Sequence, residues 1–280
     1  MTTACASATD NLPCADSYLS AEGGVRLRYR DEGRGPAVLL VHGWTLDLEM
    51  WDAQVEAWRG SLRLVRLDRR GHGLSGERGT MPGDARDLAL LCRHLKLTQV
   101  AVLGMSQGVR SALAFAAAAP ALVSALILDG PPQLAHSTPE DDVPLGRYRT
   151  LLRTQGIEAL RREWARHPLM QLRTRSPARQ ALLTAMLGRY RGEDLRTPES
   201  AAEAAELVLE SITAPALVVS GEHDLPARVR AADHLCTRLE RGERAVIASA
   251  GHLANLDNPQ AYNERCHAFL ARHLGARTPA

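Results

Sequence analysis

The chain has 280 residues, of which 45% are apolar and 24% charged, and its formal net charge is +2. This composition is ordinary for a large globular domain and excludes a collagen-like fibre and a disordered chain. The near-neutral charge argues against a basic nucleic-acid-binding protein. No apolar run in the sequence reaches the roughly 20 residues of a membrane span, so we expect no membrane partner.

The cysteines are scattered along the chain. They are Cys5, Cys14, Cys92, Cys236 and Cys266. Their odd number and the lack of a C-x-x-C pair predict reduced thiols, not a disulfide framework or a zinc site. Residues 1–16 lack the basic start and apolar stretch of a signal peptide, so we expect a flexible tail and a cytoplasmic protein.

Short apolar segments predict the strands of one sheet. In chain order they are Ser17–Ala21, Val25–Arg30, Ala37–Val41, Leu62–Leu67, Gln99–Leu103, Leu122–Leu128, Ala216–Val219 and Arg244–Ala248. Most of the later segments are almost continuously apolar, which is typical of strands buried on both faces of a parallel sheet. The first two, joined by Glu22-Gly23-Gly24, indicate an antiparallel hairpin.

Helical segments alternate with these strands. They cover about Asp84–Leu95, Gln107–Ala118, Pro226–Glu240 and Pro259–Leu274. Such alternation predicts an α/β protein with a three-layer sandwich. We expect residues 17–130 and 212–280 to form one core domain.

The alternation stops between residues 131 and 211, where we recognise no buried strand. Helix-like pieces occupy this stretch: Leu145–Gln155, Ile157–Arg166, Ala178–Arg191 and Pro198–Leu209. We predict that residues 131–211 form a helical cap over the edge of the sheet, where specificity usually resides.

Arginine is abundant in the predicted cap, with twelve arginines and four acidic residues between positions 147 and 196. One interpretation is a solvated outer face. Another is that one or two arginines point inward and bind an anionic substrate. Nucleic-acid binding is a weaker interpretation, because aromatic residues that would stack on bases are nearly absent here.

The strongest local motif is Gly104-Met105-Ser106-Gln107-Gly108, which lies between a predicted strand and a predicted helix. This is the G-x-S-x-G pattern in the strand–turn–helix context that it requires. The turn must be strained to expose the Ser106 hydroxyl, and side chains in place of the two glycines would collide with neighbouring elements. We predict that Ser106 is a nucleophile.

A serine nucleophile needs a base, and the base needs an orienting acid. His252 follows the last predicted strand and comes after Ser106, as the chain order on this kind of sheet requires. His42 and His72 precede the serine, and His223 lies directly beside the candidate acid, so His252 is preferred over all three.

The candidate acid is Asp224, which lies between Ser106 and His252 in the chain. Asp129, at the end of the strand Leu122–Leu128, is the alternative, because an acid there could reach the same imidazole. The sequence leaves open whether Asp129 replaces Asp224.

Two backbone N–H groups are expected to stabilise an oxyanion. One is the N–H of Gln107, the residue after the nucleophile, and the other is that of Trp44 in the loop after Ala37–Val41. The substrate-pocket candidates are His42, Trp44, Met105 and Leu253. Asp68 and Arg70, in the turn-forming segment DRRGHGLS at residues 68–75, are expected to pair and to hold that loop.

Together these segments resemble the α/β-hydrolase superfamily. The resemblance rests on HGW at 42–44, DRRGHGLS at 68–75, GMSQG at 104–108, GEHD at 221–224 and AGHLANLDNP at 250–259. It implies an eight-stranded, mostly parallel sheet with a helical cap and a Ser106, His252 and Asp224 triad. The segment from His252 to Pro259 is most similar to the 3-oxoadipate enol-lactonase branch, although Gln107 and Val109 depart from that branch and a general carboxylesterase is the broader expectation.

We therefore predict a serine hydrolase of carboxylic esters or lactones of small molecules, with no metal or organic cofactor. The alternatives on the same fold are a C–C bond hydrolase, an acyltransferase, a cofactor-free oxygenase and a binding module without turnover. The sequence makes no prediction about the oligomeric state.

Overall fold

The computed structural model describes residues 15–76, 81–134, 143–196 and 209–274. Its strands are β1 Ser17–Ser20, β2 Arg26–Gly33, β3 Ala37–Val41, β4 Arg63–Leu67, β5 Val100–Met105, β6 Val123–Asp129, β7 Ala216–Gly221 and β8 Gly242–Ile247. Its α-helices are α1 Asp52–Trp58, α2 Met81–His94, α3 Gln107–Ala118, α4 Leu145–Ala165, α5 Pro177–Arg189, α6 Glu193–Arg196, α7 Pro226–Arg238, α8 Ala254–Asp257 and α9 Pro259–Leu274.

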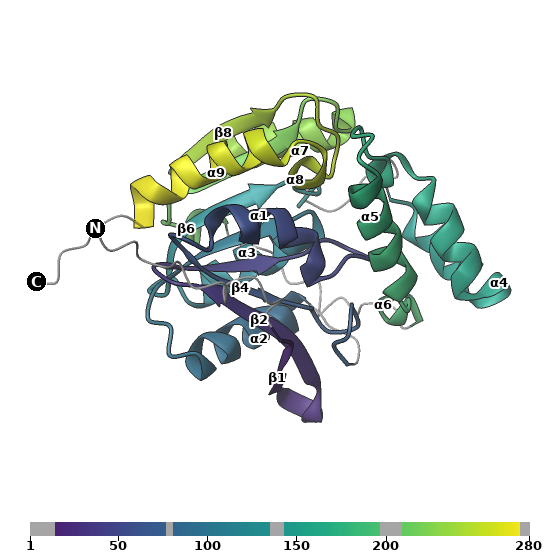
Figure 1. Cartoon of the computed structure of the whole chain (residues 1–280), viewed down its shortest axis with the longest axis horizontal. Coiled ribbons are helices and arrows are strands. Elements are labelled where there is room, and N and C mark those ends of the chain that lie inside the picture. The colour runs from purple at the N-terminus through teal and green to yellow at the C-terminus, as the bar shows by residue number, and fades with distance from the viewer. Residues whose placement is uncertain (1–14, 77–80, 135–142, 197–208, 275–280) are drawn as a thin grey trace, which may run out of the picture.

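The strands form one eight-stranded sheet in the order β1-β2-β4-β3-β5-β6-β7-β8 (Figure 1). The β1–β2 and β2–β4 pairs are antiparallel, and every other pair is parallel. The predicted mostly parallel sheet and its leading hairpin are confirmed. Helix α1 was not predicted from the sequence.

The core lies on both faces of the sheet. All five side chains of β3 are buried, as its continuous apolar sequence predicts. Helices α2, α3 and α7 contribute to the cluster on one face, and α1 and α9 contribute to the cluster on the other. Each fully buried valine or leucine stabilises the fold by about 1.5–3 kcal/mol, so these layers hold the strand ends in place.

Helices α4, α5 and α6 lie between β6 and β7 in the chain and gather beyond one end of the sheet (Figure 1). Gly156, with φ of 81°, interrupts α4 at the position where the sequence predicts two helical pieces. The predicted helix Pro198–Leu209 lies outside the described residues except for Leu209. The boundaries of a separate core domain and cap remain a prediction.

The described residues include three of the cysteines and all the helices given above. Cys92, Cys236 and Cys266 are free thiols there. None of the helices in residues 15–274, apart from the undescribed gaps, is long and apolar enough to cross a membrane. The predicted tail lies outside the described residues except for its last two, of which Asp16 pairs with Arg28 at 2.9 Å and with Arg30 at 2.7 Å.

Candidate active site

Ser106 occupies the sharp turn between β5 and α3. Its φ of 51° and ψ of −115° place it in the left-handed region, where a non-glycine residue is strained. A Cβ on Gly104 would lie 2.4 Å from the carbonyl oxygen of Gly108, and one on Gly108 would lie 2.4 Å from that of Val41. The predicted steric need for both glycines is confirmed.

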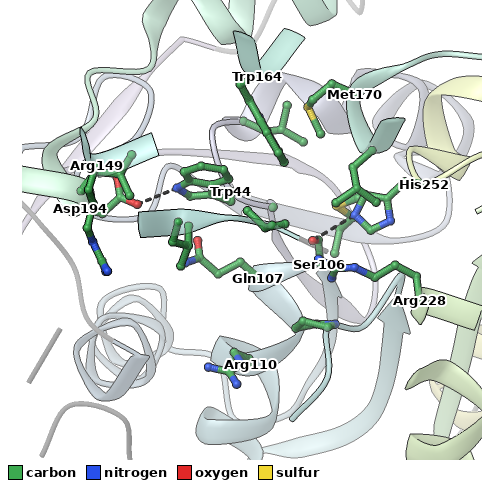
Figure 2. Close-up of a pocket in the computed structure, with 18 residues that line it drawn as sticks. Trp44, Ser106, Gln107, Arg110, Arg149, Trp164, Met170, Asp194, Arg228 and His252 are labelled. Carbon is green, nitrogen blue, oxygen red and sulfur yellow. Dashed lines mark hydrogen bonds between the residues drawn. The ribbon is translucent and has the colours of Figure 1, made fainter. Parts of the chain in front are cut away.

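Three side chains from separate loops meet at this turn. The Oγ of Ser106 lies 3.1 Å from Nε2 of His252 (Figure 2). Nδ1 of the same imidazole lies 2.9 Å from Oδ2 of Asp224. The histidine and aspartate side chains are almost completely buried. Because the carboxylate accepts the proton of Nδ1, Nε2 is left to accept the serine hydroxyl proton.

Asp129 does not occupy the position behind the imidazole. Its backbone carbonyl accepts the N–H of Ser106 at 2.7 Å. Its carboxyl is fully buried, and burial, aided by nearby Asp224, raises its pKa well above the usual value, which favours the neutral form. The Asp224 carboxylate accepts a second hydrogen bond, from the backbone N–H of Leu225 at 2.7 Å. Of the two candidate acids, Asp224 makes the hydrogen bond to His252.

A cavity of about 210 Å³ opens beside Ser106 and His252. Apolar residues and three arginines form most of its wall. The lining residues are Gly43, Trp44, Leu46, Met105, Ser106, Gln107, Arg110, Pro132, Val143, Leu145, Arg149, Trp164, Leu169, Met170, Asp194, Leu195, Arg228 and His252. Since both the sheet and the α4–α6 segment contribute residues, the cavity lies between them.

Trp44 lines the cavity as part of an aromatic cluster. Its ring centroid lies 4.7 Å from that of Trp164 and 5.7 Å from that of Tyr190. Its Nε1 donates to Asp194 at 2.6 Å, and the Tyr190 hydroxyl donates to the same carboxylate at 2.6 Å. These contacts fix the indole against the α4–α6 segment.

Two of the four pocket candidates do not line this cavity. Trp44 and Met105 do, but His42 and Leu253 do not. The imidazole of His42 is fully buried, and its Nε2 accepts the backbone N–H of Arg69. Leu253 is also buried and packs in the apolar cluster that includes Trp44 and Met105. Their selection as pocket residues is wrong, because neighbours of a site in sequence need not direct their side chains into it.

Arg69 is a residue of this region that the sequence analysis missed. Its guanidinium donates to Oε1 of Gln107 at 2.7 Å, to the carbonyl of His42 at 3.2 Å and to Asp84 at 3.0 Å. One side chain thus links the loop that holds Trp44 to the residue after Ser106. The only sequence signal was its place beside two charged residues in the DRRGHG turn.

The predicted pairing of Asp68 with Arg70 is wrong. Asp68 accepts the N–H group of Leu74 in its own loop and that of Leu48 in the segment after β3, at 2.8 Å each. Arg70 extends to Asp87 on α2, with donor–acceptor distances of 2.7 and 2.9 Å. Both residues nevertheless hold loops in place, because each binds a different neighbouring segment.

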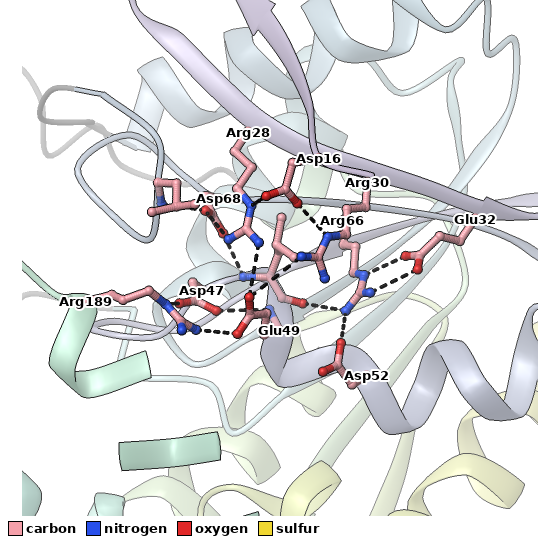
Figure 3. Close-up of polar contacts among 12 residues, drawn as sticks. Asp16, Arg28, Arg30, Glu32, Asp47, Glu49, Asp52, Arg66, Asp68 and Arg189 are labelled. Atoms are coloured by element: carbon pink, nitrogen blue, oxygen red, sulfur yellow. Dashed lines mark hydrogen bonds and ion pairs between the residues drawn. The ribbon is translucent and has the colours of Figure 1, made fainter. Parts of the chain in front are cut away.

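A chain of charged groups ties α5 to the sheet (Figure 3). Arg189 donates to Asp47 at 2.7 Å and to Glu49 at 2.6 Å. Glu49 also accepts from Arg28 at 3.1 Å, and Arg28 lies 3.3 Å from the buried Asp68. Since Arg28 is itself buried on β2, these contacts fix one side of the α4–α6 segment over the cavity.

His42 and His72 are buried neighbours whose ring centroids lie 5.2 Å apart. Nε2 of His42 accepts the Arg69 N–H at 2.9 Å, so Nδ1 carries the proton and donates to the Gly43 carbonyl at 2.8 Å. Burial, with the nearby Arg69 guanidinium, lowers the pKa of His42 well below its usual value and that of His72 to about 4.

We expect these histidines to make the fold sensitive to acid. Below about pH 6.5 the unfolded chain binds protons at both positions, whereas the folded protein leaves His72 neutral until about pH 4. The free energy of unfolding therefore falls as the pH drops through this window. The decrease in Tm between pH 7 and pH 5 should be smaller for His72→Gln than for the unsubstituted protein.

The exposed His234 offers a matched control, and His234→Gln should keep the full decrease in Tm. An unchanged pH dependence in His72→Gln would show that its ring is not the group that resists protonation.

Comparison with known proteins agrees with this architecture. A family model described as the alpha/beta hydrolase fold matches residues 36–259. Among curated proteins, the chain is similar to the putative 2-succinyl-6-hydroxy-2,4-cyclohexadiene-1-carboxylate synthase of Bacillus subtilis (strain 168), with 28% identity over 270 residues that cover 90% of this chain and 97% of that protein.

Two solved structures are similar over nearly their whole length. One is a thermophilic esterase from Thermogutta terrifontis with malate bound, with a TM-score of 0.78, 26% identity and coverage of 92% of this chain and 99% of that one. The other is the enol-lactonase from Burkholderia xenovorans LB400, with a TM-score of 0.75, 25% identity and coverage of 91% and 100%. The chain therefore belongs to the α/β-hydrolase fold family, with an esterase and an enol-lactonase among its structural neighbours.

Proposed function

We propose that the protein is a serine hydrolase that cleaves a carboxylic ester or lactone of a small molecule. The observation that carries this proposal is the hydrogen-bonded series from Ser106 through His252 to Asp224, with distances of 3.1 and 2.9 Å. Nucleophile, base and orienting acid at such distances are the arrangement that acyl transfer requires. The similarity to an esterase and an enol-lactonase supports esters and lactones as the substrate classes.

In the proposed reaction the Ser106 hydroxyl attacks the substrate carbonyl while His252 accepts its proton. Asp224 stabilises the imidazolium that forms, without taking the proton itself. His252 then returns the proton to the leaving alkoxide, and an acyl-enzyme remains. Water, activated by the same imidazole, attacks the acyl group and releases the acid.

The negative charge on the tetrahedral oxygen needs preorganised donors. We assign them to the backbone N–H groups of Gln107 and Trp44, two residues that line the cavity beside Ser106. Such donors are typically worth about 10²- to 10³-fold in turnover each. The contact of Arg69 with Gln107 supports this assignment, because it restrains one of the two segments.

Covalent labelling with a fluorophosphonate tests the nucleophile directly. We expect one phosphonyl adduct per chain, located on Ser106 by peptide mass spectrometry, because the reagent requires an activated serine hydroxyl. Ser106→Ala should remove the adduct, whereas Ser61→Ala, at an exposed serine, should retain it. An intact protein that stays unlabelled, or that is labelled at another serine, would contradict the proposal.

A further inference from the structure

The candidate active-site cavity has a strongly positive wall. Arg110 from α3, Arg149 from α4 and Arg228 from α7 all line it, so three separate elements contribute a guanidinium (Figure 2). Of the twelve arginines between positions 147 and 196, Arg149 lines the cavity. The other two guanidiniums come from outside the arginine-rich stretch that the sequence analysis singled out.

The wall also contains one acidic residue, which neutral aromatic side chains hold in place. Asp194 lines the cavity, but its two oxygens accept hydrogen bonds from the Trp44 indole and the Tyr190 hydroxyl, at 2.6 Å each. Its carboxylate is therefore held by the aromatic cluster. The cavity wall thus carries three arginines and one aspartate, so positively charged side chains outnumber negatively charged ones among its lining residues.

Arg228 is the most buried of the three arginines, with only 4% of its side chain exposed. It lies in the first turn of α7, four residues after Asp224, and Figure 2 shows its side chain extending toward Ser106. Arginine is rarely buried to this degree, and its position beside the serine brings a permanent charge close to the reacting carbonyl.

Arg149 on α4 and Arg110 on α3 bring two further positive charges to the cavity wall. The Nε atoms of both are buried and have no hydrogen-bond partner within the described residues. One Nη atom of Arg110 donates to the Gln133 carbonyl at 3.3 Å, so that side chain is partly anchored. A buried donor without a partner costs free energy, and a ligand that accepts its hydrogen bond in the cavity would recover that cost.

We propose that the protein selects substrates that carry a carboxylate close to the scissile ester or lactone carbonyl, and that Arg228 is the principal specificity-determining residue. This inference rests on the proposed hydrolase function. The planar guanidinium matches a carboxylate through two parallel hydrogen bonds. The apolar side chains of Leu46, Leu169 and Met170 cover the carbon chain that joins the two groups.

The test compares two substrates that differ only in charge, methyl hydrogen succinate and its primary amide, methyl succinamate. We expect kcat/KM to favour the acid by about 10- to 100-fold, the value of one charge-assisted hydrogen bond or pair in a partly buried site. Arg228→Gln should reduce this ratio at least tenfold, and Arg228→Lys should restore part of it because the positive charge returns.

Arg153→Gln is the matched control. Arg153 lies on the exposed side of α4, one turn from Arg149, and does not line the cavity. The variant loses the same positive charge as Arg228→Gln, but from an exposed position on α4 outside the cavity, and should keep the preference for the acid. Equal kcat/KM for the acid and the amide in the unsubstituted protein would overturn the proposal. So would a fall in the acid-to-amide ratio of Arg153→Gln as large as that of Arg228→Gln.

A binding measurement separates this inference from the hydrolase proposal. Calorimetric titration of Ser106→Ala with succinate should show binding that Arg228→Gln, introduced into the same variant, weakens about tenfold or more. Loss of that binding without any ester hydrolysis by the unsubstituted protein would support the carboxylate site and reject the hydrolase. Tighter binding of inorganic phosphate than of succinate would overturn the assignment to a carboxylate.

Discussion

Replacing Ser106 with alanine is expected to lower kcat/KM for p-nitrophenyl butanoate by at least about 10⁴-fold. The substitution removes the oxygen that would attack the carbonyl and keeps the Cβ, so the strained backbone of the turn is unchanged. Hydrolysis is followed by release of p-nitrophenol, and thermal unfolding of the variant shows whether the fold persists.

Some hydrolysis by Ser106→Ala is still expected above the uncatalysed rate. The proposed N–H donors of Trp44 and Gln107 remain in this variant. In serine proteases, such donors together with substrate binding still accelerate hydrolysis about 10³- to 10⁴-fold over the uncatalysed reaction in water. Activity within tenfold of the unsubstituted protein would refute Ser106 as the nucleophile. Ser61→Ala, at an exposed position, should be fully active.

The second large effect is expected for Asp224→Asn, with a loss of about 10⁴-fold in kcat. An amide nitrogen at this position would donate to Nδ1 of His252, where the carboxylate now accepts at 2.9 Å. The imidazole would then carry its proton on Nε2, the atom that faces Ser106 at 3.1 Å, and could not accept the hydroxyl proton. Steady-state kinetics at pH 7 to 8 measures the loss.

Asp129→Asn is the matched control for this experiment. Burial raises the pKa of the Asp129 carboxyl and favours its neutral form, so an amide of the same shape should change kcat less than tenfold. The hydrogen bond from the Ser106 N–H to this residue uses the backbone carbonyl and is unaffected. The reverse result, a large loss in Asp129→Asn and a small one in Asp224→Asn, would move the acid to the end of β6.

The buried strands and the turn at Ser106 are features that local sequence patterns predict. Continuous apolar runs predict strands buried on both faces, and the parallel strands that follow have their carboxyl ends at one edge. Residues in the loops after those strands, such as Ser106, Asp224 and His252, are therefore expected at the same edge of the sheet. The glycines at 104 and 108 were predictable for a related reason, since the turn leaves no room for a Cβ.

Local sequence patterns do not show which side chains line the cavity. His42 and Leu253 are close to the site in the chain, yet they are buried and do not line the cavity, whereas Arg228 on α7 does. Arg69 has the same charge as its neighbour Arg70, but one binds Gln107 and the other binds Asp87.

The sequence by itself determined the succession of the strands along the chain, several of the helices, the turn at Ser106 and the candidates for acid and base, because these follow from backbone sterics and chain direction. The tertiary structure decided that Asp224 rather than Asp129 hydrogen-bonds His252, and which arginines line the cavity. Side-chain direction depends on packing between segments far apart in the chain, and short-range residue patterns do not record it.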